Sequence, residues 1–158
     1  MKKVIEFILL NNIVNKQLEN DGEANHADAD KLEAIGDSLS SEENDALCRY
    51  ANKELILSIR IDAANKSLKY VLIEPKLKSY YKLIGCQYIE AAYPFKSKNH
   101  LYVDEEGFLK PNPPAVFYKE HGVLAGNAVV LSSDEEGNDL STTLTIKEVR
   151  NQIHFINN

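Results

Sequence analysis

Two segments, LKYVLIEP at residues 68–75 and AGNAVVL at residues 125–131, decide the fold that we expect for this chain. Both are apolar and contain β-branched residues, as buried strands do. Between Leu68 and Phe155, strong turn signals separate short apolar segments; these signals are Glu74-Pro75, Asp104-Glu105-Glu106-Gly107, Lys110-Pro111-Asn112-Pro113-Pro114 and Asp134-Glu135-Glu136-Gly137. Short strands divided in this way predict a hairpin-rich domain with a mixed, mainly antiparallel sheet and packed helices, of the α+β class.

Further elements are expected around these two segments. Residues 55–61 alternate as a strand, and the helix after Pro75 ends at Gly85, where a left-handed cap is favourable. We also expect a strand over 86–93, a hairpin joining 101–103 to 108–109, and a short helical or extended element over 115–119. Thr145 and Glu148 form a capping-box signature, which predicts a C-terminal helix with Ile146, Val149, Ile153 and Ile156 on one face.

The first 62 residues differ in character from the rest. Residues 3–18 favour an amphipathic helix, although the block 4–10 is also compatible with a strand. Residues 20–30 have little apolar content and are expected to form a mobile loop, whereas Ser40 and Glu43 predict the start of a helix that runs to about Glu54. We therefore expect a mainly helical, acidic N-terminal part over 1–62 and a compact α+β domain over 63–158.

Charge separates the same two parts. The chain has 158 residues and a net charge of -6; residues 1–62 hold 13 Asp and Glu against 7 Lys and Arg, and residues 63–158 hold 11 of each kind. The absence of a basic stripe argues against direct nucleic-acid binding, and the acidic surplus is compatible with a protein partner that has a basic face. The two cysteines, the lack of an export signal and the lack of a long apolar run predict a cytoplasmic protein without a membrane span.

No catalytic centre or metal site is expected. The carboxylates of the two Asp-Glu-Glu-Gly turns are interpreted as solvated, so none is suited to act as a general acid at neutral pH. Neither Cys nor His occurs at the spacing of a zinc site, and the two glycines at 122 and 126 lack the context of a dinucleotide loop. We therefore expect a protein that is not an enzyme and has no cofactor.

A ligand cleft is the one site that the residues suggest. Asn127 enters an apolar strand, so its amide must either satisfy local backbone groups or face a ligand. Aromatic and polar side chains of the same region are candidates to line such a cleft, with a surface suited to a base or sugar. The candidate ligand-binding residues are Tyr102, Asn112, Tyr118, His121 and Asn127.

The region from Leu68 to Phe155 also resembles a known family. The ordered segments YVLIEP (70–75), LIG (83–85), YIE (88–90), LYVDEEG (101–107), PNP (111–113) and AGNAVV (125–130) are similar to those of the domain of unknown function 3846 family. The chain departs from that pattern at Cys86-Gln87 and over its first 60 residues. The resemblance implies a small accessory protein of a phage or mobile element, with no assigned reaction.

These observations lead to two main hypotheses for the function, and an enzyme is the third and least favoured. In the first, a non-catalytic protein binds a host protein partner and modulates host defence, a step that rests on analogy. In the second, the protein sequesters a small nucleotide-derived signal in a cleft or at the interface of a homodimer. Salt-sensitive binding through the first 60 residues would favour the first, and a bound small molecule the second.

Overall fold

The computed structural model describes residues 1–156, which divide into two compact units, Met1–Leu55 and Ile56–Asn158. The first is an N-terminal helical unit and the second a C-terminal α+β unit. The division falls seven residues before the expected boundary at residue 62. The reason is that the intervening segment forms strand β1 (Ile56–Asp62), which pairs with two strands of the C-terminal unit.

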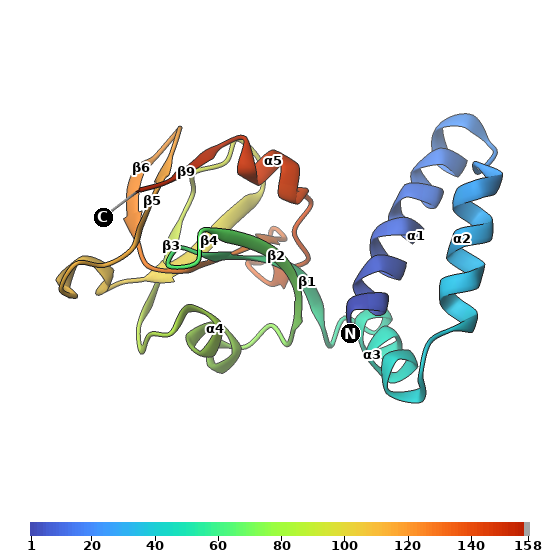
Figure 1. Cartoon of the computed structure of the whole chain (residues 1–158), viewed down its shortest axis with the longest axis horizontal. Helices are drawn as coiled ribbons and strands as arrows, with labels where there is room; N and C mark the ends of the chain where they lie inside the picture. The colour runs from blue at the N-terminus through green and yellow to red at the C-terminus, as the bar shows by residue number, and fades with distance from the viewer. Residues whose placement is uncertain (157–158) are drawn as a thin grey trace. The chain divides into compact units, whose positions relative to one another are not determined.

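The N-terminal helical unit contains α1 (Lys2–Asp21), α2 (His26–Asp37) and α3 (Ser41–Ala51). Helix α1 confirms the helical interpretation of residues 3–18, and its buried side chains Val4, Ile8 and Val14 face the neighbouring helices. The capping box of α3 is confirmed, because Ser40 and Glu43 bond to each other's backbone N–H groups. The α1 and α2 ribbons, drawn in blue, run side by side (Figure 1).

The prediction of a mobile loop over residues 20–30 is wrong for most of this segment. Helix α1 continues to Asp21, and α2 begins at His26 after a short turn at Gly22. The side chain of Asn25 accepts a hydrogen bond from the backbone N–H of Ala27, which caps α2. Local capping and the packing of α2 against α1 therefore outweigh the low apolar content of the segment.

The C-terminal α+β unit confirms the expected α+β class. Within residues 56–156 the pairings are antiparallel: a six-stranded sheet has the order β2-β1-β7-β4-β3 with β8 beside β7, and a three-stranded sheet has the order β6-β5-β9. The remaining strands are β2 (Ser67–Ile73), β3 (Ile89–Ala92), β4 (Asn99–Asp104), β5 (Ala115–Tyr118), β6 (Gly122–Ala125), β7 (Ala128–Ser133), β8 (Asp139–Leu140) and β9 (Ile153–Phe155), and the helices are α4 (Leu77–Ile84), η1 (Gly107–Leu109) and α5 (Ile146–Arg150).

The larger sheet is buried on both faces. Ile59, Leu101 and Val130 point to one face, where residues of the smaller sheet and Val149 of α5 complete the core. Val129 and Leu131 point to the other face and pack against Tyr80 and Ile84 of α4. Because both of its faces are covered, the first four residues of β7 are apolar, and the central position expected for the 125–131 segment is confirmed for residues 128–131. Ala125 instead ends β6 of the smaller sheet.

Two sequence predictions are corrected by the pairing of the strands. Phe108 and Leu109 do not form a hairpin with residues 101–103, because η1 occupies that segment and β4 pairs with β3 and β7 instead. The C-terminal helix starts at its predicted capping box but ends at Arg150, and Ile153–Phe155 pairs with β5. In both places a partner distant in sequence decides the structure.

Candidate functional sites

The structure does not bring together the five residues expected to line a ligand cleft. Tyr102 on β4 lies on the face of the larger sheet that packs against α4, whereas Tyr118 on β5 is buried in the core on the opposite face. His121 is exposed in the turn between β5 and β6, and Asn112 is exposed after η1 with a positive φ of 46°. Tyr102 and Tyr118 therefore do not flank one common cleft.

Asn127 has a structural role. Its side-chain oxygen accepts a hydrogen bond from the backbone N–H of Ala63 at 2.9 Å, and its amide nitrogen donates to the carbonyl of Ile84 at 3.2 Å. The amide thus joins the turn after β1 to the C-terminal end of α4. Of the two alternatives raised by the sequence, the contacts agree with satisfaction of backbone groups, although these groups lie 64 and 43 residues away rather than locally.

Asp104 differs from the solvated turn carboxylate that we expected. It is buried at the end of β4, where it accepts hydrogen bonds from the backbone N–H of Glu106 and from the Lys110 ammonium group. The hydrogen bond to Asp104 raises the pKa of Lys110. Glu105 and Glu106 are exposed, so the solvated interpretation applies to them but not to Asp104.

A polar and aromatic cluster, which we call the Asp139 cluster, lies on the α4 side of the larger sheet. The Asp139 carboxylate accepts hydrogen bonds from the Tyr80 hydroxyl at 2.7 Å and from the Tyr102 hydroxyl at 3.1 Å. His100 Nε2 lies 3.8 Å from the same carboxylate. Ring centroids are 4.9 Å apart for Tyr80 and Tyr102, 5.2 Å for His100 and Tyr102, and 5.8 Å for Tyr93 and His100.

Burial and the carboxylate determine the protonation of this cluster. Burial, together with Asp139, raises the pKa of Tyr102 to about 12 and that of Tyr80 further. Burial lowers the pKa of His100, although the Asp139 carboxylate and the Lys98 carbonyl favour its charged form. At neutral pH the two phenols and the imidazole of this cluster are therefore neutral.

The same face contains a serine and a histidine, but they do not form a nucleophilic pair. Ser58 Oγ and His100 Nδ1 are buried, and neither has a hydrogen-bond partner among the described residues. Ser58 is fully buried, so a substrate has no access to its hydroxyl. No group of His, Cys, Asp and Glu suited to a metal ion occurs in the part of the chain that the structure describes.

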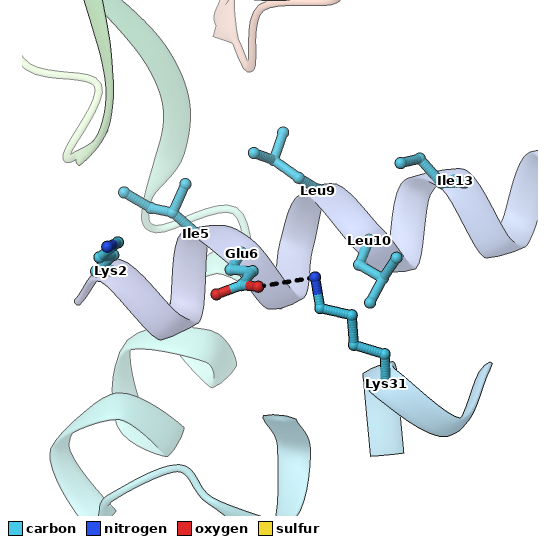
Figure 2. A pocket seen from close by; sticks show the side chains of 7 residues that line it. All are labelled: Lys2, Ile5, Glu6, Leu9, Leu10, Ile13 and Lys31. Carbon is cyan, nitrogen blue, oxygen red and sulfur yellow. Dashed lines mark ion pairs between the residues drawn. The ribbon is translucent and has the colours of Figure 1, made fainter. Parts of the chain in front are cut away.

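The N-terminal helical unit carries a groove of about 530 Å³ along α1. Ile5, Leu9, Leu10 and Ile13 form its apolar surface, and Lys2, Glu6 and Lys31 complete the lining. Figure 2 shows that Lys31 reaches from α2 to Glu6 of α1, where their charged groups are 3.0 Å apart. We call this surface the α1 groove.

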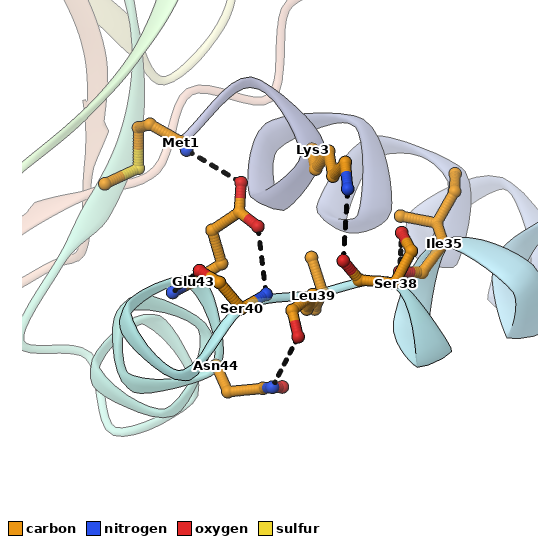
Figure 3. A network of polar contacts seen from close by, with 8 residues as sticks. All are labelled: Met1, Lys3, Ile35, Ser38, Leu39, Ser40, Glu43 and Asn44. Atoms are coloured by element: carbon orange, nitrogen blue, oxygen red, sulfur yellow. Dashed lines mark hydrogen bonds and ion pairs between the residues drawn. The ribbon is translucent and has the colours of Figure 1, made fainter.

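Polar contacts between the helices hold α1 in place. The Met1 amino group bonds to Glu43 at 3.0 Å, and Lys3 Nζ donates to the carbonyl of Ser38 at 3.1 Å (Figure 3). Hydrogen bonds from the Ser40 backbone and the Met1 amino group lower the pKa of the Glu43 carboxyl. The α1 groove is therefore built on a helix with fixed neighbours.

The comparisons with known proteins identify the family. A family model described as Domain of unknown function (DUF3846) matches residues 57–154. The chain belongs to the DUF3846 family. The DUF3846 match contains the Asp139 cluster but not the α1 groove. No curated protein and no solved structure matches the chain.

Sequence reasoning missed both the Asp139 cluster and the α1 groove. Asp139 follows an Asp-Glu-Glu-Gly turn, and nothing in its local sequence distinguishes it from the solvated carboxylates beside it. The groove residues Ile5, Leu9 and Ile13 recur every four residues, so this second apolar stripe of α1 was visible in principle. None of the described helices is long and apolar enough to span a membrane.

Proposed function

We propose that this DUF3846 protein is a non-catalytic binding protein whose N-terminal helical unit captures an amphipathic helix of a protein partner. The α1 groove carries the proposal, because it presents an apolar surface on a helix whose opposite stripe is already buried. Grooves of this kind take up helices with apolar residues at positions i, i+3 or i+4, and i+7.

Charge indicates the chemistry of the partner. Residues 1–55 contain 12 Asp and Glu and 6 Lys and Arg, so the unit carries a net charge of -6. A second copy of this acidic unit would be repelled, whereas a helix with basic flanks would be attracted from a distance. Within the groove, Glu6 and Lys31 already pair and Lys2 adds one positive charge. Apolar contact therefore provides the local affinity, and the attraction of basic flanks comes from the acidic residues elsewhere in the unit.

The cellular context of the proposal comes from the family resemblance. It suggests a cytoplasmic accessory protein of a phage or mobile element that binds a host protein and modulates host defence. The alternative, sequestration of a nucleotide-derived signal, receives less support, because Tyr118 is buried in the core and the Asn127 amide is bound by backbone groups.

A pair of matched variants tests the proposal. Ile13 lies in the α1 groove and is 49% exposed, while Leu18 lies on the same helix outside the groove and is 47% exposed. The probe is a synthetic amphipathic helix with lysines on its polar face, measured by fluorescence anisotropy with the full chain. Ile13→Glu should weaken binding about tenfold or more, and Leu18→Glu less than about twofold, because only the first places a charge in the apolar contact.

Two outcomes would contradict the proposal. One is equal binding of the lysine peptide to the parent, Ile13→Glu and Leu18→Glu, and the other is no binding to the parent. A second peptide, with glutamates in place of the lysines, separates the roles of shape and charge. Equal affinity for the two peptides would support the α1 groove as the binding surface and would contradict the basic character of the partner.

A further inference from the structure

We infer that Asp139, Tyr102 and Tyr93 of the C-terminal α+β unit form a binding site for an organic cation, namely a guanidinium or primary ammonium group. This site is independent of the α1 groove and lies within the residues that match DUF3846. Three observations support it: an unbalanced carboxylate, aromatic rings in the same cluster, and unused hydrogen-bonding capacity on that carboxylate.

The first observation is the charge of Asp139. Its side chain is 15% exposed, and among residues 1–156 no lysine or arginine forms an ion pair with it. The two tyrosine hydroxyls that it binds are neutral, and burial disfavours a charge on His100. Carboxylates removed from water are normally balanced by a cation, so the missing charge is expected to come from a ligand.

The second observation is the aromatic environment. Tyr102 is half-buried beside the carboxylate, and the ring of Tyr93, which is 70% exposed, lies next to that of His100 in a tilted arrangement. The faces of tyrosine rings attract cations, and the attraction grows when water is excluded. An exposed ring next to a half-buried one suits a flat guanidinium group or the end of an alkylammonium chain.

The third observation is unused hydrogen-bonding capacity. A carboxylate has about four acceptor positions, and two phenolic hydroxyls occupy only part of that capacity. A cation with several N–H groups donates to the remaining positions of the carboxylate, whereas a quaternary ammonium ion has no N–H group to donate.

The cationic group that binds this site has two possible sources. One is a free small molecule such as an amine or arginine, and the other is an arginine or lysine side chain of a protein partner. The first experiment addresses the shared chemistry. Ethylguanidinium, ethylammonium and the neutral analogue ethylurea are titrated into the full-length protein, and backbone amide shifts are followed by NMR. We expect saturable shifts at Tyr93, Tyr102 and Asp139 with the two cations and none with ethylurea.

Matched variants locate the site. Asp139→Asn preserves the shape of the side chain. Tyr93→Ala removes an exposed ring and leaves the core intact, so it tests the site even if Asp139→Asn does not fold. Asp139→Asn should weaken binding about tenfold or more, and Tyr93→Ala about two- to fivefold, as expected for a cation–π contact with an exposed ring. Glu135→Gln is the control, because this carboxylate lies in the turn between β7 and β8, close to Asp139 in sequence, and is 94% exposed in its side chain. It should retain parental affinity.

The inference is overturned if the parent does not respond, if ethylurea produces the same shifts as ethylguanidinium, or if folded Tyr93→Ala binds as tightly as the parent. If the site responds, free arginine and the peptide Gly-Arg-Gly distinguish the sources. Tighter binding of free arginine supports a small-molecule cation, and tighter binding of the peptide supports a partner's side chain.

Discussion

The side-chain oxygen of Asn127 accepts a hydrogen bond from the backbone N–H of Ala63 at 2.9 Å, across 64 residues of sequence. The same amide donates to Ile84, so one side chain positions both the turn after β1 and the end of α4. The amide therefore supports the sheet on which the Asp139 cluster is built.

Replacing Asn127 by Ala should lower the free energy of unfolding by about 1–3 kcal/mol, because a backbone donor and a backbone acceptor lose their partner. Chemical denaturation followed by circular dichroism measures this change. Asn138→Ala is a comparison at an exposed turn amide. An Asn127→Ala protein as stable as the parent would show that water replaces the amide without cost.

Tyr80→Phe should lower the free energy of unfolding by about 1–2 kcal/mol, since it removes a buried hydroxyl that donates to Asp139 at 2.7 Å. Tyr81→Phe, on the next and less buried position of α4, is the matched control and should change stability much less. Thermal and denaturant unfolding of the three proteins compare the effects. Equal losses for the two variants would indicate that the bond to Asp139 contributes no specific stability.

His100 should make folding stability depend on pH in the mildly acidic range. Burial lowers the pKa of His100 below the usual 6.5, so the unfolded chain binds its proton first as the pH falls. The stability contribution is therefore complete above about 6.5 and is lost as the pH falls toward the folded-state pKa. Denaturation midpoints of the parent should decline over this window, and those of His100→Gln should decline less.

The exposed His121 provides the control for this pH experiment, as His121→Gln also removes one histidine. We expect the denaturation midpoint of His121→Gln to decline with falling pH as much as that of the parent. Identical pH profiles for the parent and His100→Gln would argue against a buried neutral imidazole. Asp62, whose pKa is lowered from its usual value of 3.8, affects stability only at lower pH.

Asp104 and Glu105 are adjacent acids that should respond differently to substitution. Asp104→Ala removes the acceptor of the Glu106 N–H group and of the Lys110 ammonium group, so it should cost about 1–3 kcal/mol of stability. Glu105→Ala removes an exposed charge and should change stability by less than about 0.5 kcal/mol. Thermal unfolding of both variants checks the contrast, and equal stabilities would support the solvated interpretation for both residues.

The C-terminal α+β unit should fold when the chain is cut before Ile56 but not when it is cut before Ala63. Strand β1 lies between β2 and β7, and its Ile59 and Ile61 side chains are fully buried. A fragment of residues 56–158 should show a cooperative thermal transition, and a fragment of residues 63–158 should lack one. Cooperative unfolding of the shorter fragment would show that the sheet closes without β1.

The sequence by itself determined the elements whose causes are local. The capping boxes at Ser40 and Thr145 start helices where they were predicted, and Gly85 ends α4 in the left-handed conformation with a φ of 84°. The apolar run ending at Leu131 forms the central strand β7, because a strand covered on both faces needs no polar side. In each case the decisive residues lie within a few positions of one another.

Only the tertiary structure decided the features that depend on distant partners. Residues 153–155 become β9 because β5 is available for pairing, although their apolar spacing also fits a helix. Asp139 differs from the solvated acids near it in sequence because two tyrosines donate hydrogen bonds to it. These are Tyr80, 59 residues away, and Tyr102, 37 residues away. Local sequence does not encode which strands become neighbours, and that arrangement alone places a carboxylate among aromatic rings.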